Sequence, residues 1–151
     1  MNSYAVANMW QDRAENGDPV AQFNLGYCYE MGQGLPVNLE EACRWYIRAA
    51  NQGYPRAQYH LGLACSFGGV RGLKHDPAQA CKWLMIAARN GILHARHALN
   101  ELKTSPEERS LGEKLAREFL AHPEPQNRIL TDMQMPFNSP AANGKQMGFE
   151  F

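Results

Sequence analysis

The sequence contains two phrases that each occur twice, and this repetition constrains the fold more than any other feature. The stretch AQFNLGYCYEMGQG begins at Ala21 and returns as AQYHLGLACSFGG at Ala57. The stretch EACRWYIRAANQGYPRAQ begins at Glu41 and returns as QACKWLMIAARNGILHAR at Gln79. The copies lie about 36 to 38 residues apart, a period within the range of helix-turn-helix repeats. The sequence therefore predicts stacked structural units rather than one compact fold.

Each unit is predicted to contain two helices. In the first unit, Ala21 and Leu25 belong to an apolar series at three- and four-residue steps, which predicts a helix over about residues 20–31. Gly32 ends this helix, because glycine adopts the left-handed conformation without steric cost. Asn38 then caps a second helix, whose first turn carries acidic side chains.

The second unit follows the same plan, and partial units flank the pair. Gly68 ends its first helix, and Asp76 caps its second with Pro77 at the first helical position. A helix over about residues 3–16 matches the second helix of a unit, and one over about residues 94–102 matches a first helix.

A last helix is predicted to close the array. Ser105 opens it with a Ser-x-x-Glu capping box, and it ends near Ala121. Its polar outer face is what a terminal repeat needs. The chain is thus predicted to be all-α, a superhelical solenoid of about seven helices. In the last helix the expected apolar stripe consists of Leu111, Leu115, Phe119 and Leu120.

The repeats divide the chain into a solenoid and a tail. Prolines and glycines interrupt every pattern after His122, and such a composition cannot bury enough apolar surface to fold alone. The tail is therefore predicted to be disordered or to adhere to the solenoid. The predicted parts are the solenoid over 1–121, made of a half repeat 3–18, repeats 19–54 and 55–92, and a partial repeat with capping helix 93–121, followed by the tail 122–151.

The two units share a sequence pattern of small and aromatic residues at fixed positions. In the first unit these are Ala21, Leu25, Gly26, Tyr29, Gly32, Gly34, Ala42, Trp45, Tyr46, Ala49, Ala50 and Gly53. In the second they are Ala57, Leu61, Gly62, Gly68, Ala80, Trp83, Ala87, Ala88 and Gly91, with departures at Cys65 and Leu84. This pattern resembles the Sel-1-like repeat, a relative of the tetratricopeptide repeat, over roughly residues 6–102.

The resemblance implies a right-handed superhelix whose first helices line a concave face. It also implies a non-catalytic adaptor or scaffold that binds a peptide or helix of another protein there. Related bacterial chains occur in signalling, envelope-assembly and secretion-associated complexes. The alternative is an exported, disulfide-braced repeat protein that acts at the cell envelope or with an enzyme complex, since one cysteine-rich branch of the family links its helices in this way.

Four cysteines bear on that alternative: Cys28, Cys43, Cys65 and Cys81. They form no C-x-x-C pair, so the sequence does not indicate a zinc site. One interpretation is four small, buried and reduced thiols. The other is a pair of helix-to-helix disulfides.

Charge and composition restrict the partner. The chain has no net charge, but residues 56–98 carry six basic residues against Asp76 alone. This belt between acidic ends favours an acidic protein partner or lateral contact between copies of the protein, and it is too thin for nucleic-acid binding. No apolar run is long enough to span a membrane. The first residues lack the features of a secretory signal, so a cytoplasmic location is expected.

The repeat register identifies candidate partner-binding residues on the first helices. They combine aromatic rings with arginine, as binding hot spots do. The alternative is that Phe23 and Tyr59 simply cover the neighbouring helix. The candidates are Phe23, Tyr27, Met31, Arg56, Tyr59, Leu63, Phe67, His94 and His97.

No cofactor, metal site or catalytic residue is predicted. His94 and His97 share a helix face, on which Glu101 is the only acidic residue. The sequence fixes no third metal ligand beside the two histidines, and surface histidines are the commoner outcome. Catalytic sequence motifs are absent, and the Gly-x-Gly at Gly32 follows a predicted helix, whereas a dinucleotide-binding loop follows a strand.

The tail offers one further hypothesis. Met133, Met135 and Phe137, and later Met147, Phe149 and Phe151, alternate with a period of two. Segments of this kind add to a partner or dock in a groove, including one on the same protein. Self-association through the tail is therefore open, beside simple disorder.

Overall fold

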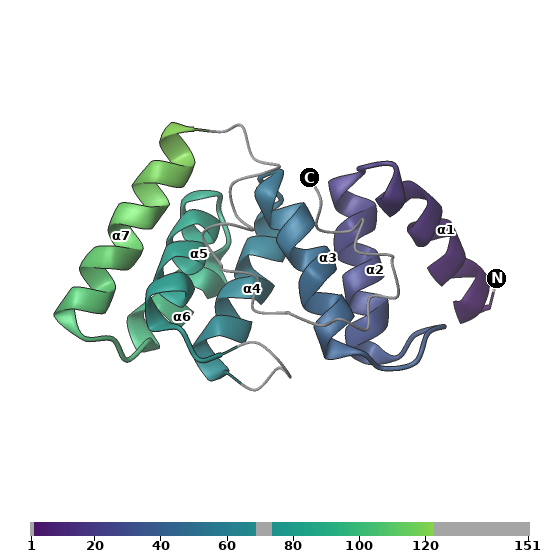
Figure 1. The fold of residues 1–151 in the computed structure, drawn as a ribbon, viewed down its shortest axis with the longest axis horizontal. Coiled ribbons are helices and arrows are strands. Elements are labelled where there is room, and N and C mark those ends of the chain that lie inside the picture. The colour runs from purple at the N-terminus through teal and green to yellow at the C-terminus, as the bar shows by residue number, and fades with distance from the viewer. Residues whose placement is uncertain (1, 69–73, 123–151) are drawn as a thin grey trace.

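The computed structural model describes residues 2–68 and 74–122, where helices joined by short loops make up all of the regular secondary structure. No strand occurs in these two ranges, so the predicted all-α solenoid is confirmed. The helices shown in Figure 1 are α1 (Ser3–Glu15), α2 (Pro19–Met31), α3 (Leu39–Asn51), α4 (Pro55–Phe67), α5 (Pro77–Arg89), α6 (Leu93–Glu101) and α7 (Pro106–Ala121).

The helices pack against their neighbours in chain order. Contacts join α1 to α2, α2 to α3, α3 to α4 and α4 to α5, and α5 then contacts both α6 and α7. Figure 1 shows this row along the longest axis, with α1 at one end and α7 at the other. Each unit therefore shields the apolar side of the next, which is the defining property of a solenoid.

Side-chain caps fix where the helices begin, as predicted for three of them. The Asn38 side chain accepts a hydrogen bond from the Glu41 amide at 3.1 Å, and that of Asp76 accepts from the Gln79 amide at 3.0 Å. Ser105 forms the complete capping box of α7. Each bond satisfies an amide that the first helical turn leaves unpaired.

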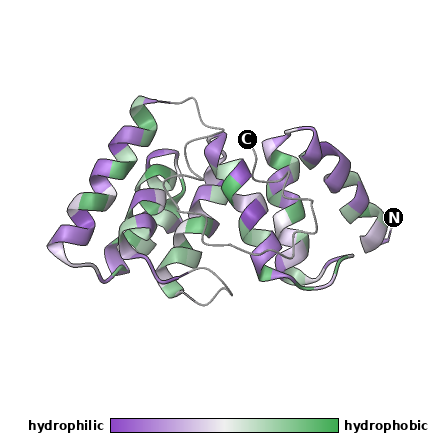
Figure 2. Cartoon of the chain, viewed as in Figure 1, coloured by the Kyte–Doolittle hydropathy of each residue, from purple (hydrophilic) through white to green (hydrophobic). Residues whose placement is uncertain are grey.

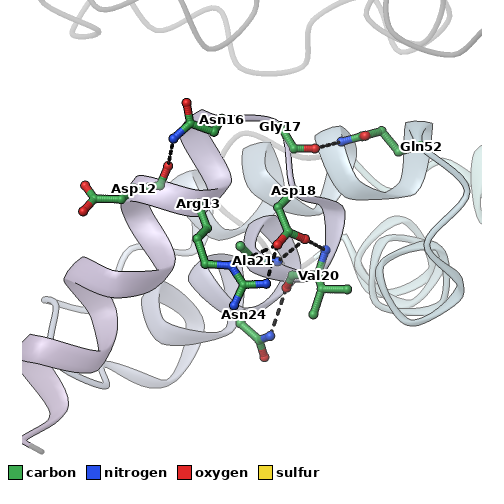
Figure 3. Close-up of polar contacts among 9 residues, drawn as sticks. All are labelled: Asp12, Arg13, Asn16, Gly17, Asp18, Val20, Ala21, Asn24 and Gln52. Carbon is green, nitrogen blue, oxygen red and sulfur yellow. Dashed lines mark hydrogen bonds and ion pairs between the residues drawn. The ribbon is translucent and has the colours of Figure 1, made fainter.

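A cap at Asp18 was missed by sequence reasoning. Its carboxylate accepts from the amides of Val20 and Ala21, so α2 begins at Pro19 rather than at Val20. Figure 3 shows that the Arg13 side chain of α1 reaches the same carboxylate, at 2.5 Å. One aspartate therefore both starts α2 and ties it to α1.

Small residues at equivalent positions let first and second helices approach closely. Ala21 and Ala57 are both fully buried. A Cβ atom on Gly26 would lie 2.8 Å from the Tyr46 ring, and one on Gly62 would lie 2.8 Å from the Leu84 side chain. The Leu-Gly pair of each repeat is therefore a packing requirement.

A glutamine at the start of each first helix joins consecutive units. The Gln22 amide donates to the Ala14 carbonyl, and the Gln58 amide donates to the Ala50 carbonyl, each at 3.2 Å. The Gln52 side-chain amide donates to the Gln22 side chain at 2.9 Å. It also donates to the Gly17 carbonyl, as Figure 3 shows. This repeated polar junction fixes how one unit follows another.

The buried face of α7 matches the predicted stripe in part. Phe119 and Leu120 pack against the core, and the Phe119 ring lies 5.4 Å from that of Trp83. Leu111 is 48% exposed, while Gly112 and Ala116 are buried. A Cβ atom on Gly112 would lie 2.6 Å from the Cys81 Cβ atom. Helix α7 thus approaches α5 through small residues, and the larger Leu111 lies outside that contact. Figure 2 shows hydrophilic and hydrophobic residues alternating along α7, as expected of a helix covered on one side.

Candidate partner-binding surface

Two neighbouring hollows open where consecutive units meet. The first, about 300 Å³, lies between the two full units, and the second, about 410 Å³, lies between the second unit and α6. Leu63 and Phe67 of α4 line both hollows and form the wall between them. The other lining residues are Glu30, Leu39, Ala42, Cys43, Tyr46, His60 and Ala64 in the first hollow, and Ser66, His75, Ala98, Glu101, Leu102 and Lys103 in the second.

Phe67 is the most exposed apolar residue of this wall. It is the last residue of α4, and 79% of its surface is accessible. Gly68 then turns the chain with φ 58°, and His75 returns against this turn, where its ring contacts the Ser66 carbonyl at 2.8 Å. A phenylalanine ring held in water at a helix end, between two hollows, is available to a partner.

Glu30 places a negative charge in the first hollow. The Tyr46 hydroxyl donates a hydrogen bond to its carboxylate, and His60 Nδ1 lies 3.6 Å from the same oxygen. His60 and then Tyr46 hold the pKa of Glu30 below its usual value, although burial acts in the opposite direction. The pKa of Tyr46 is raised by burial and by the neighbouring carboxylate. Glu30 is therefore an anion near neutral pH.

His60 is the centre of an aromatic cluster that sequence reasoning missed. Its ring lies 5.2 Å from the rings of Phe23 and Tyr46, and 5.8 Å from that of Tyr59. The register did contain a signal, because His60 follows Arg56 by four residues and precedes Leu63 by three. One helical stripe of α4 thus runs from Arg56 through His60 to the hollows.

The structure brings some of the predicted residues together and separates others. Leu63 and Phe67 line the hollows. Arg56 lies over the Phe23 ring at 5.9 Å, and Tyr59 lies 6.4 Å from the ring of His94. The remaining candidates, Tyr27, Met31 and His97, are exposed but line neither hollow.

Phe23, predicted as a partner-binding residue, does not lie on the surface. It is only 5% exposed, because its ring packs against Tyr46 and Tyr54 as well as His60. The Arg56 guanidinium covers the remaining side. Phe23 therefore supports the surface from within, as the alternative interpretation of covering a neighbouring helix described.

The four cysteines are buried free thiols. Burial and the charge of Glu30 raise the pKa of Cys43 to about 12, and burial raises the pKa of Cys65. A thiol reacts as its thiolate, so a raised pKa makes these cysteines poorly reactive near neutral pH.

No cluster of three or more potential metal ligands occurs in the part of the chain that the structure describes, the surroundings of His94 and His97 included. Across the same residues, no helix has the length and apolar character needed to cross a bilayer.

Comparison with known proteins identifies the two repeated units. The profile of the family described as Sel1 repeat matches residues 19–54 and 55–92. The chain carries two Sel1 repeats. Sel1 repeats are generally protein–protein interaction modules that lack catalytic activity, and the resemblance inferred from the repeated pattern is confirmed.

Solved structures extend the likeness beyond the two repeats. A protective antigen of uropathogenic Escherichia coli that displays an SLR fold matches with a TM-score of 0.72 and 27% identity, over 87% of this chain and 28% of that one. A Sel1 repeat protein from Oxalobacter formigenes matches with a TM-score of 0.58 and 32% identity, over 74% of this chain and 48% of that one.

Curated relatives match little more than a third of this chain. The chitin synthase regulator SKT5 of Saccharomyces cerevisiae is 50% identical over 52 residues, which cover 34% of this chain and 8% of that protein. The DAP3-binding cell death enhancer 1 of Rattus norvegicus is 44% identical over 57 residues, or 38% and 11% of the two chains. The matched stretches thus span about a tenth of these much longer relatives.

Proposed function

We propose that this protein is a non-catalytic adaptor that holds a peptide or helix of a partner protein across the two hollows. The observation that carries the proposal is the shared wall of Leu63 and Phe67, which leaves a phenylalanine ring 79% exposed between two cavities. A rigid aromatic anchor beside a pocket is the usual centre of a binding hot spot. Arg56, Tyr59 and His94 extend this surface toward the other ends of the first helices.

The names of two relatives agree with a role in binding or regulation. SKT5 is a regulator of chitin synthase, and the rat protein binds DAP3. The adaptor role proposed here requires only that the shared repeats contribute a binding surface. A cytoplasmic location remains part of this proposal.

The prediction of an acidic partner depends on the basic belt. Of the belt residues, Lys82 is fully buried and Arg56 is engaged over Phe23, so the belt is not one continuous surface. Among the described residues that line the first hollow, the only formal charge is the carboxylate of Glu30. We therefore expect the apolar wall, rather than the basic belt, to dominate affinity.

Photo-crosslinking tests the proposal directly. The photoreactive phenylalanine analogue p-benzoylphenylalanine would replace Phe67 in one variant and Leu93 in the other. Leu93 is the matched control, because it is 74% exposed yet lines neither hollow. A partner crosslinked from position 67 and not from 93 supports the proposal. Equal crosslinking from both positions, or from neither, would contradict it.

A further inference from the structure

The two hollows match an extended segment with alternating apolar side chains. Helix α4 supplies their shared wall, and packed helices lie about 8–10 Å apart. In an extended strand, side chains two residues apart are separated by about 7 Å, and those four apart by about 13 Å. A short strand with a period of two can therefore place one side chain in each hollow.

This chain contains such a segment outside the described residues. Residues 145–151 read KQMGFEF, in which Met147, Phe149 and Phe151 alternate with other residues. Three apolar side chains thus face one side when the segment is extended. They are also the flexible and aromatic types that fill apolar pockets.

The charges of this segment complement the two hollows. Lys145 precedes the apolar residues, and Glu150 lies among the last of them, about 17 Å away in an extended chain. Of the lining residues that the structure describes, Glu30 is the only formal charge in the first hollow, while Lys103 lies in the second beside Glu101. One orientation therefore places Lys145 near Glu30 and Glu150 near Lys103.

The earlier alternating segment fits less well. It comprises Met133, Met135 and Phe137, and both of its charges precede the first methionine. Pro136 also removes a backbone donor within the alternating run. Only residues 145–151 combine apolar alternation with a charge of each sign at opposite ends.

The intervening chain is long enough for docking on the same molecule. Residues 123–144 can span up to about 75 Å when extended. Helix α7, with 16 residues, is about 24 Å long. A tether of this kind gives a local concentration on the order of millimolar.

We propose that residues 145–151 dock across both hollows of the same chain and compete with the outside partner. The proposal rests on the surface assigned in the proposed function and adds its regulation: the adaptor carries its own competitor. A partner must displace this segment, so its apparent affinity is reduced by the fraction of molecules in which the segment is docked.

A labelled peptide tests the docking. The probe is the sequence KQMGFEF with a dye at its start and an amide at its end, and its binding to full-length variants is followed by fluorescence anisotropy. The double variant Phe149→Ser, Phe151→Ser frees the hollows, so the probe should bind it at least tenfold more tightly than wild type. Adding Phe67→Ser should abolish this binding, and adding the control Leu93→Ser should not.

The matched control for the tail is Met133→Ser, Met135→Ser, which should bind the probe as wild type does. Equal affinity of wild type and the Phe149→Ser, Phe151→Ser variant would overturn the proposal, as would no binding to that variant. Sedimentation equilibrium should show a monomer. A dimer that the same double variant dissociates would assign the docked segment to a second copy, and would overturn docking within one chain.

Failure of this proposal is distinguishable from failure of the adaptor role. Crosslinking of a partner from position 67, without binding of the peptide probe, would leave the adaptor role standing and remove the internal competitor. Probe binding that depends on Phe67, without any partner crosslinked there, would support docking of residues 145–151 in the hollows and count against the adaptor role.

Discussion

The two full repeats share a backbone plan and differ in the chemistry built on it. Gly26 and Gly62 occupy the same position, yet Gly26 faces the ring of Tyr46 and Gly62 faces the aliphatic side chain of Leu84. Only the tyrosine carries a hydroxyl, which donates to Glu30. The buried positions therefore set the fold, while single exchanges between units give each junction its own surface.

If the two units are equivalent in their cores, the same truncation should cost the same in both. Leu25 and Leu61 are each fully buried. We expect Leu25→Ala and Leu61→Ala to lower the free energy of unfolding by about 2–5 kcal/mol each. Urea denaturation followed by circular dichroism measures both. A loss below about 1 kcal/mol in one variant alone would show that the two repeats are not equivalent.

Adding a methyl group tests the close helix approach. A Cβ atom at Gly26 would lie 3.0 Å from the Ala42 carbonyl as well as against Tyr46. At Gly62 it would meet the Leu84 side chain at 2.8 Å and the Leu84 backbone nitrogen at 3.2 Å. Overpacking of this kind costs about 1–3 kcal/mol, more than the gain in helix propensity. We expect Gly26→Ala to destabilise more than Gly62→Ala in thermal denaturation, because its backbone contact is the shorter of the two, 3.0 Å against 3.2 Å. The reverse order would contradict this account.

Most local features of the fold were predictable from the sequence, the cap at Asp18 excepted, and features that depend on distant residues were not. The caps at Asp76 and Ser105 were predicted because their bonds reach only three residues along the chain. The role of His60 was missed because its ring contacts come largely from other helices.

Size and packing explain the other differences. Phe23 was expected on the surface, but three rings bury it. Leu111 was expected inside, but α7 contacts α5 through Gly112 and Ala116, since a smaller side chain permits a closer approach. Of the candidate site, Leu63 and Phe67 follow from the repeat register, whereas the hollows themselves depend on how consecutive units stack.

The tyrosine hydroxyl that distinguishes the first repeat should stabilise it. Tyr46→Phe removes the donor to Glu30 and leaves the ring contacts with Phe23 and His60 in place. We expect a loss of about 1.5–3 kcal/mol in the free energy of unfolding at pH 7, as for a hydrogen bond to a charged group. In a double-mutant cycle with Glu30→Ala, which removes the acceptor, most of this loss should disappear. Additive losses would mean that the hydroxyl acts elsewhere.

The same carboxylate should make the first repeat sensitive to acid. The pKa of Glu30 is lowered in the folded protein, so its contribution is fully present above the unfolded value of about 4.3 and is lost as the pH falls through the folded value. The stability difference between wild type and Glu30→Gln should therefore shrink between pH 6 and pH 3. Ser66 occupies the equivalent position in the second repeat, so Ser66→Ala is the control and should show no such change. A difference that is constant with pH would mean that Glu30 acts without its charge.

Substitutions at the exposed ends of the two first helices should change the free energy of unfolding least, but should differ most in their effect on binding. Met31 and Phe67 end the first helices of the two repeats at equivalent positions and are 54% and 79% exposed. Because both side chains already lie largely in water, Met31→Ser and Phe67→Ser should each change the free energy of unfolding by less than about 0.5 kcal/mol. Only Phe67 lines the hollows, so only Phe67→Ser should weaken binding of the KQMGFEF probe to the Phe149→Ser, Phe151→Ser variant. Equal weakening by both substitutions would mean that the binding surface follows the ends of the first helices rather than the wall between the hollows.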